Sequence, residues 1–333
     1  MTVEITIIGL GQTGSSFGLA LAERKQYVHR TGHDKEASVA QAAQKMGAVD
    51  EVSYNLHRAV EGADIVLLTI PIDQIRSTLE VIAEDLKEGA VVMDTSPAKQ
   101  VVAEWIKELL PEGRYYVGLT PGINPLYIQE AMVNPVSAKE DFFKSGVIAV
   151  SAPQGTPSEA YKLAADLIKL VGAEPLFADM LEMDGLMTSA QLIPQLLSSV
   201  LIYTLVHQPG WREARKFAGS DFWSIGAPCE RATTPTALAQ TWMANRDNIH
   251  RLIDLFIAVL QDWQSDIDRG NTERIGEEID LAQKRFRTWQ SERKAAEWEQ
   301  AGLAGKEEIP SSAERMASLI GLGGRFRKKT KQG

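Results

Sequence analysis

The feature that most constrains this chain is a glycine loop close to its start. Residues 3–8 form a β-rich apolar run that ends where the loop begins. The loop carries Gly9, Gly11 and Gly14 at the spacing G-x-G-x-x-G, and a helical pattern of apolar residues follows at once. The spacing alone is a weak signal, but a strand before it and a helix after it make it strong. The segment therefore predicts the first crossover of a Rossmann fold, in which these glycines form the tight turn, let the backbone approach a phosphate and let the helix pack on the strand.

The same segment predicts which residues hold a dinucleotide. Backbone N–H groups at Gln12 and Thr13 face the pyrophosphate at the start of the helix. Asp34 lies 20 residues beyond the last glycine, where a carboxylate accepts hydrogen bonds from the adenosine ribose. This acid favours NAD, whereas the neighbouring Arg30 and Lys35 would suit the 2′-phosphate of NADP, so NADP stays open. A turn residue without a ligand is the alternative for Asp34.

Short apolar runs alternate with helical stretches through the first part of the chain. The apolar runs cover residues 27–33, 65–70, 91–93, 115–117, 147–150 and 174–178. Helical patterns between them cover residues 37–46, 75–86 and 100–110. This alternation predicts an α/β fold with a doubly wound parallel sheet of the Rossmann type.

After residue 178 the pattern changes to long helical segments, at residues 183–206, 236–263 and 272–298. We therefore expect three parts: an NAD(P)-binding Rossmann domain over 1–178, an all-helical substrate and dimerisation domain over 179–300, and a tail over 301–333 with a short helix. The segment 183–206 is apolar on more than one face, so it must be covered on several sides. This breadth predicts a homodimer formed through the helical domain.

The composition narrows the class of partner. A net charge of -9 and a pI near 5.2 disfavour a nucleic-acid partner and favour a small-molecule substrate. Cys229 is the single cysteine, and the five histidines show no metal-ligand spacing, so we predict neither a disulfide nor a metal site. No uninterrupted apolar run approaches the roughly 20 residues of a membrane helix. We therefore expect a cytoplasmic protein without a membrane anchor.

The order of several further segments resembles the prephenate and arogenate dehydrogenases. Besides the glycine loop, the segments that carry the resemblance are residues 63–66 leading to Ile70 and Pro71, residues 94–96 with Lys99, the turn at 118–121, and residues 183–184, 192–195 and 245. The resemblance implies an NAD(P)-dependent oxidoreductase that makes tyrosine precursors by oxidation with decarboxylation. It also implies a Rossmann domain followed by a helical dimerisation domain, with Ile70 and Pro71 beside the cofactor.

The resemblance also assigns site residues. Ser96 corresponds to a family serine that contacts the nicotinamide and the substrate hydroxyl. Thr120, before a proline, takes the place of the family's catalytic histidine, and Gln195 takes the place of a second substrate-facing histidine. The family's substrate-binding arginine is expected near residues 220–227, where none stands; Arg231 is the nearest candidate.

These replacements keep three functions open. A general base contributes roughly 10² to 10⁴ in rate to such an oxidation, and threonine is no base at neutral pH. Our leading hypothesis is a dehydrogenase of the prephenate type with altered or weak prephenate activity. The alternatives are an imine or ketone reductase acting on another substrate, and a non-catalytic NAD(H)-binding sensor or partner protein. Asp184 is a further candidate proton acceptor, although a cap of its own helix is the favoured interpretation.

Overall fold

The computed structural model describes residues 2–128, 137–230 and 234–295. The chain divides into two units, Met1–Ile275 and Gly276–Gly333. Helix α13 (Thr272–Ala295) begins in the first unit and is the described part of the second. The predicted tail over 301–333, with its short helix, lies outside the described residues.

The first unit contains one eight-stranded sheet with the strand order β3-β2-β1-β4-β5-β6-β7-β8. The strands are β1 (Val3–Ile8), β2 (Val28–His33), β3 (Glu51–Val52), β4 (Ile65–Leu68), β5 (Val91–Asp94), β6 (Tyr115–Pro121), β7 (Val147–Ser151) and β8 (Glu174–Phe177). Every neighbouring pair is parallel except β6 and β7. The described part of the β6–β7 connection contains a short 3-10 turn, Pro125–Tyr127, where a parallel pair would need a long crossover. The predicted α/β class is confirmed, and the antiparallel pair is what the alternation pattern did not predict.

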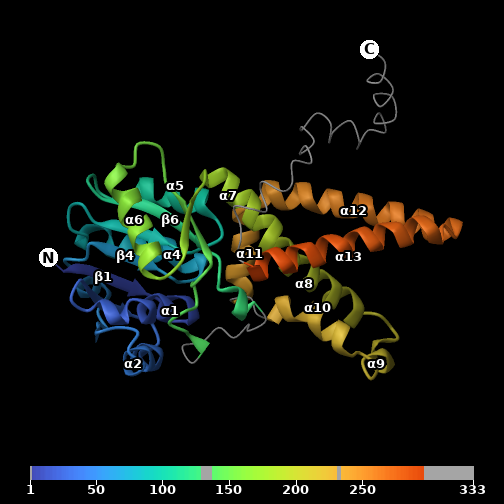
Figure 1. Cartoon of the computed structure of the whole chain (residues 1–333), viewed down its shortest axis with the longest axis horizontal. Coiled ribbons are helices and arrows are strands. Elements are labelled where there is room, and N and C mark those ends of the chain that lie inside the picture. Colours follow the sequence, from blue (N-terminus) through green and yellow to red (C-terminus); the bar gives the residue numbers. More distant parts are fainter. Residues whose placement is uncertain (1, 129–136, 231–233, 296–333) are drawn as a thin grey trace, which may run out of the picture. The chain divides into compact units, whose positions relative to one another are not determined.

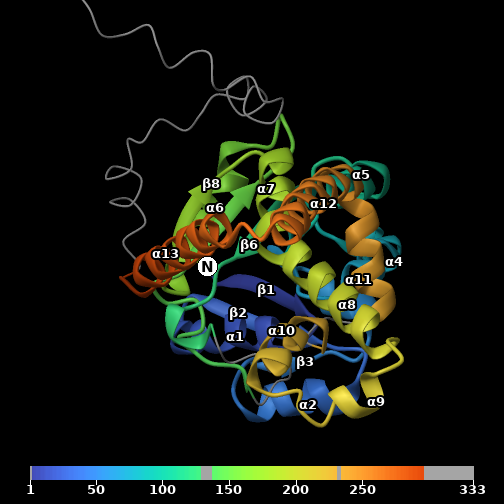
Figure 2. The ribbon, with the colours of Figure 1, turned by 90° about the vertical axis from the view of Figure 1, so that its right-hand side faces the viewer.

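Helices cover both faces of this sheet (Figures 1 and 2). The helices on one face are α1 (Gln12–Ala20), α2 (Ala37–Lys45) and α6 (Ser158–Leu170), and those on the other are α3 (Leu56–Val60), α4 (Ile72–Ile82) and α5 (Lys99–Leu109). Side chains alternate along each strand, so Ile65 and Leu67 belong to one core while Val66 and Leu68 belong to the other. Both faces of the sheet are therefore buried, and the carboxyl ends of the strands are left for a ligand.

Two short elements, β3 and α3, were not predicted from the sequence. They are two and five residues long, too short for a period of two or 3.6 to show. Asn55 caps α3 by accepting a hydrogen bond from the backbone N–H of Arg58 at 3.1 Å. These elements extend the sheet beyond β2 without changing the class of fold.

The chain then forms a helical region within the first unit. Its helices are α7 (Met180–Met187), α8 (Ile193–Val206), α9 (Trp211–Ala214), α10 (Ser220–Glu230), α11 (Pro235–Ala244) and α12 (Arg246–Arg269). The single helix predicted over 236–263 is wrong, because the chain breaks at Asn245. Its side-chain amide donates to the Thr241 carbonyl at 3.2 Å, the kind of local bond by which asparagine competes with helix continuation.

Helices α7 and α8 are joined by a π-helical turn, Thr188–Leu192. Pro194 stands in the first turn of α8, where its ring and missing N–H disturb the helical ladder of the turn before it. Helix α8 packs against α10 (Figure 2). The Ser198 hydroxyl donates to the Ile225 carbonyl at 2.6 Å. Wide turns of this kind are frequent at functional sites.

Among the described residues, Met180–Val206 forms one helical run that is long and apolar enough to cross a membrane by length and composition. Its best window has a mean hydropathy of 1.4, and 22% of that window is buried in this chain. This corrects the expectation that no apolar stretch reaches such a length. The expectation counted uninterrupted apolar residues, whereas the helix includes polar residues that a windowed mean tolerates.

Candidate active site

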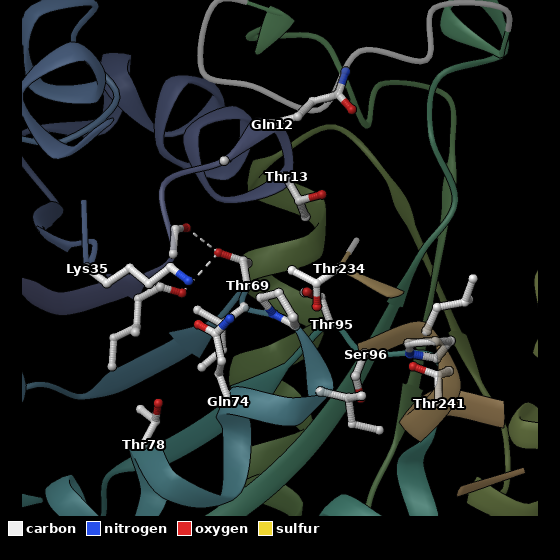
Figure 3. A pocket seen from close by; sticks show the side chains of 18 of the residues that line it. Gln12, Thr13, Lys35, Thr69, Gln74, Thr78, Thr95, Ser96, Thr234 and Thr241 are labelled. Atoms are coloured by element: carbon white, nitrogen blue, oxygen red, sulfur yellow. Dashed lines mark hydrogen bonds between the residues drawn. The ribbon is translucent and has the colours of Figure 1, made fainter. Parts of the chain in front are cut away.

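A cavity of about 670 Å³ opens where strands β1, β2, β4 and β5 end. We call the part lined by the glycine loop and residues 33–35 the strand end. The other part, the helical end, is lined by Gln191, Gln195, Thr234, Leu238 and Thr241. Ser96 also lines the cavity, and Figure 3 shows Lys35 on one side of it with Ser96 and Thr241 on the other. The cavity therefore lies at the carboxyl ends of parallel strands, where ligands bind in sheets of this kind.

The three loop glycines are required for different physical reasons. Gly9 has a φ of +91°, and a Cβ there would lie 2.7 Å from the Thr69 carbonyl oxygen. A Cβ on Gly14 would collide with the Gly9 carbonyl oxygen. At Gly11, no described atom would lie within 4 Å of a Cβ. The protein itself therefore demands glycine at the first and third positions, whereas the second faces open space in the cavity.

The fold holds this loop in place from two neighbouring strands. Thr69, which follows β4, donates its hydroxyl to the carbonyls of Ile8 and Gly9 at 3.1 and 2.5 Å, as the dashed lines in Figure 3 show. Asp34, which follows β2, accepts a hydrogen bond from the Leu10 N–H at 2.8 Å. A preformed loop with an open second glycine fits a dinucleotide pyrophosphate.

Asp34 lines the cavity beside His33 and Lys35. Besides Leu10, its carboxylate accepts the Glu36 N–H at 2.9 Å, so the side chain is fixed at the end of β2. A carboxylate has acceptor sites beyond these two, so it can also accept from a ribose hydroxyl.

Arg30 is not a candidate for the 2′-phosphate, which corrects the sequence-based suggestion. Its side chain is 1% exposed and pairs with Asp50 at 2.7 Å. It also donates to the carbonyls of Gly18, Gly47 and Ala48. Position 30 points into the fold because side chains alternate along β2, and Lys35 is the remaining cation of the pair.

A buried polar cluster lies directly behind Ser96. Asp94, at the end of β5, is 0% exposed and accepts four hydrogen bonds. Two reach Oδ1, from the Ser96 N–H at 2.8 Å and the Ser96 hydroxyl at 2.5 Å. Two reach Oδ2, from Lys99 Nζ at 2.9 Å and the Tyr116 hydroxyl at 2.6 Å. The cluster joins β5, β6 and the start of α5 beneath the cavity.

Burial sets the titration of this cluster. It lowers the pKa of Lys99, and the neighbouring Asp94 carboxylate opposes that shift. Burial also raises the pKa of Tyr116 well above its ordinary value, and the negative charge of Asp94 adds to the effect. Tyr116 therefore stays a neutral hydrogen-bond donor across the physiological range.

Asp184 caps α5 and not its own helix, which corrects the favoured interpretation. Its carboxylate, on α7, accepts the backbone N–H groups of Lys99 at 2.6 Å and Gln100 at 3.1 Å. The N-cap of α7 is Asp179, which accepts the N–H of Leu181 at 2.8 Å. Burial raises the pKa of Asp184, and the two N–H donors of α5 oppose that shift. The helical region is thus joined to the Rossmann sheet directly behind the site.

The helical end of the cavity is polar and uncharged. Of the described residues that line it, none carries a formal charge. Gln195 lies one residue after Pro194 in α8, and its Oε1 is buried with no hydrogen-bond partner among the described residues. Such an orphaned acceptor is satisfied when a ligand or water supplies a donor.

The structure brings most of the predicted site residues together. Those that line one cavity are Gly9, Gly11, Gln12, Thr13, Asp34, Ile70, Pro71, Ser96 and Gln195. Gly14 packs against the loop behind the lining. Thr120 does not line the cavity; it is 8% exposed on β6, and its hydroxyl has no partner among the described residues. Arg231, the nearest arginine, lies outside the described residues.

Sequence reasoning missed Tyr116, one of the donors to Asp94, and most of the helical end. Tyr116 reaches Asp94 only because β5 and β6 lie in register, with Val92 opposite Tyr116. Gln191 comes from the π-helical turn, and Thr234 and Thr241 come from the N-cap and body of α11; none of them carries a motif. No cluster of His, Cys, Asp or Glu in the described ranges is placed to hold a metal ion, and the absence of a metal site stays a prediction.

The sheet, the glycine loop and the cavity define a nucleotide-binding protein of the Rossmann class. Residues 17–176 match the family model of the prephenate dehydrogenase nucleotide-binding domain. Prephenate dehydrogenase of Bacillus subtilis is 23% identical over 290 residues, which cover 86% of this chain and 74% of that protein. Cyclohexadienyl dehydrogenase of Zymomonas mobilis is 23% identical and is covered to 96%, with 85% of this chain matched.

A solved structure agrees over the same length. Prephenate dehydrogenase from A. aeolicus, in complex with hydroxyphenyl propionate and NAD+, superposes with a TM-score of 0.74 at 19% identity. The match covers 86% of this chain and 99% of that one. The chain is therefore similar to the prephenate dehydrogenase family over most of its length, and these relatives support a dehydrogenase. The nucleotide-binding domain, together with the NAD+ in that structure, supports NAD as its cofactor.

Proposed function

We propose that NAD(H) binds with its pyrophosphate over Gly11 and its adenosine ribose on Asp34. The open space at Gly11 and the fixed Asp34 carboxylate support this placement. Gln12 and Thr13 begin α1, where N–H groups and the helix dipole attract phosphate. Because Arg30 is committed to Asp50, Lys35 alone favours a 2′-phosphate, and we expect NAD to bind more tightly than NADP.

We further propose a dehydrogenase that turns over prephenate poorly. The observation that carries this proposal is the uncharged helical end, where the described lining offers neither a titratable base nor a cation. A substrate carboxylate would lose its hydration there without gaining a charged partner, which costs binding or rate. Gln195 and Thr120, at the expected histidine positions, cannot take a proton at neutral pH.

The proposed roles follow from position. NAD+, when bound, supplies the acceptor for the hydride that leaves the substrate carbon. Ser96 contacts the reacting hydroxyl from the floor of the cavity. Gln195 accepts a hydrogen bond from the substrate through its orphaned Oε1.

The test is NADH formation with prephenate and with arogenate, followed by NADH consumption with a panel of ketones and imines. We expect prephenate turnover at least two orders of magnitude below an ordinary rate of about 10 per second. Turnover of prephenate near that rate would overturn the proposal of weak activity.

A second candidate, an imine or ketone reductase, is favoured by the same uncharged lining, because a neutral substrate needs no cation. Turnover of a panel member above that of prephenate would select it. NADH binding without turnover of any substrate would select the third candidate, a non-catalytic NAD(H)-binding sensor or partner protein.

We also propose a cytoplasmic homodimer with no membrane or nucleic-acid partner. Helix α12 exposes a group of apolar side chains, namely Leu255, Phe256, Ile257, Val259 and Leu260. An obligate interface that covers such surface buries on the order of 2,000 Å² or more. Light scattering should give twice the 36.6 kDa chain mass at micromolar concentration, and a particle of 36.6 kDa would refute the dimer.

A further inference from the structure

The buried polar cluster behind Ser96 fixes the direction of the hydrogen bond between Ser96 and Asp94. Asp94 accepts hydrogen bonds from Lys99 Nζ, the Tyr116 hydroxyl and the Ser96 N–H, besides the Ser96 hydroxyl. An ionised carboxylate accepts hydrogen bonds and donates none, so it can satisfy all of these donors at once. The proton between Ser96 Oγ and Asp94 Oδ1, at 2.5 Å, therefore belongs to serine and points at the carboxylate.

This direction determines what Ser96 offers to the cavity. The Ser96 hydroxyl donates to Asp94 Oδ1 at 2.5 Å, with the Ala98 carbonyl a more distant acceptor at 3.4 Å, so its oxygen presents lone pairs to a ligand. Ser96 lines the cavity, whereas Asp94 is 0% exposed and reaches it only through Ser96. A substrate hydroxyl at this place donates to Ser96, and a carboxylate acceptor stands one hydrogen bond further in.

We propose that Ser96 and Asp94 form a proton relay that accepts the substrate's hydroxyl proton, an inference that rests on the proposed dehydrogenase function. The substrate O–H bond breaks and its proton bonds to Ser96 Oγ. At the same time the Ser96 O–H bond breaks and its proton bonds to Asp94 Oδ1. NAD+ is the co-reactant that receives the hydride and with it both electrons, so the alcohol becomes a carbonyl. Asp94 becomes neutral, and Ser96 keeps one proton throughout.

The charges around Asp94 suit this relay. Lys99 of α5 and Tyr116 of β6 donate to the carboxylate oxygen that Ser96 does not contact. Asp184 of α7 faces the backbone N–H of Lys99, and the strand neighbours Leu68 and Gly118 are uncharged. The oxygen Oδ1 can therefore take a proton from Ser96 while Lys99 and Tyr116 keep their bonds to Oδ2. The relay gives a substrate hydroxyl proton an acceptor beside Ser96, while the uncharged helical end still limits a substrate that carries a carboxylate. Asp94 is therefore a positioning residue that acts through the catalytic Ser96.

The first test is a readout that needs no substrate. Ser96 Oγ lies 2.5 Å from Asp94 Oδ1, and we expect the proton of such a short charge-assisted hydrogen bond to give a far-downfield NMR signal that exchanges slowly with water. We expect this signal in the parent and in Ser77→Ala, a control that removes an exposed serine hydroxyl on α4. We expect it to be absent in Ser96→Ala. A parent without the signal would overturn the relay.

The second test uses the pH profile of whichever substrate the parent turns over. Ser96→Ala should lower kcat by about 100-fold or more and change the NADH dissociation constant by less than about twofold. Tyr116→Phe should move the acid limb of kcat/KM to higher pH, because the ionised carboxylate loses a donor that favours its charged form. Ser77→Ala should leave both unchanged.

The outcomes separate the two proposals. An acid limb that stays in place in Tyr116→Phe, while the parent is active, would overturn the relay and leave the dehydrogenase proposal standing. NADH binding without turnover of any substrate would overturn the dehydrogenase proposal, and the relay with it. A Ser96→Ala variant as active as the parent would also refute the relay.

Discussion

The two ends of the cavity are built by different means. The strand end is made of backbone: a glycine loop fixed by Thr69 and Asp34, with charged side chains at its rim. The helical end is made of side chains from the π-helical turn, α8 and α11 with its N-cap, and its described lining is uncharged. Backbone geometry serves a cofactor shared by many enzymes, whereas side chains set which substrate is accepted. Resemblance to a family therefore says more about the strand end than about the helical end.

The largest expected effect breaks the strand end. Gly11→Val should weaken NADH binding by at least about 100-fold, or about 2.7 kcal/mol, because the side chain fills the space proposed for the pyrophosphate. Its melting temperature should stay close to that of the parent, since a Cβ at Gly11 meets no described atom within 4 Å.

Gly14→Val is the matched control, because its side chain collides with the Gly9 carbonyl and should lower stability itself. Calorimetry with NADH and thermal unfolding separate the two variants. A Gly11→Val protein that binds NADH as tightly as the parent would contradict the placement of the pyrophosphate over Gly11.

The next prediction concerns the helical end. Thr120→His should restore a base at the family's histidine position and raise residual prephenate kcat/KM by at least about tenfold. The assay is NADH formation with prephenate, and an unchanged NADH dissociation constant is its internal control. No response would count against the assignment of position 120, which lies on β6 outside the cavity lining.

A smaller effect sharpens the choice of cofactor. Asp34→Ala should weaken both NADH and NADPH, because the carboxylate also holds the Leu10 N–H. It should weaken NADH more, lowering the preference for NADH over NADPH by about tenfold, which corresponds to about 1.4 kcal/mol. Titration of both cofactors measures the ratio. Tighter NADPH binding by the parent would overturn the preference for NAD.

The smallest effect concerns the link between the two ends. Asp184→Asn should cost about 1 to 2 kcal/mol in free energy of unfolding, because one of two N–H groups at the start of α5 loses its acceptor. Burial raises the pKa of Asp184 above its usual 3.8, so protonating it favours the folded state. The stability that this shift contributes is complete below pH 3.8 and is lost as the pH rises through the raised value. The parent's advantage over the variant in urea unfolding should therefore shrink with rising pH, and a growing advantage would contradict the assignment.

The sequence allowed the strand end to be predicted because its signals are local. A glycine loop, the strand before it and an acid 20 residues on are all read along one chain segment. Gln191, Thr234 and Thr241 could not be predicted, because the packing of the helical region brings the π-helical turn and α11 together. Gln195 and Ser96 were found only through resemblance to a family.

The polar cluster behind Ser96 could be predicted from the sequence only in part. Asp94 and Lys99 lie five residues apart around the β5–α5 turn and stood out in the sequence. Tyr116 joins them only through the register of β5 and β6, and Asp184 joins them through the packing of α7 on α5. Arg30 was predicted as a possible phosphate ligand and is not one. Its side chain points into the fold because side chains alternate along the strand. A local sequence pattern places a residue along the chain but does not say on which face of a buried strand it lies.

A crystal structure with NADH bound tests the central claim most directly. We predict the pyrophosphate over Gly11, the adenosine ribose on Asp34 and nicotinamide C4 within about 4 Å of Ser96. The uncharged lining of the helical end should then lie beyond the nicotinamide. A nicotinamide directed toward Lys35, or NADH bound away from this cavity, would contradict it.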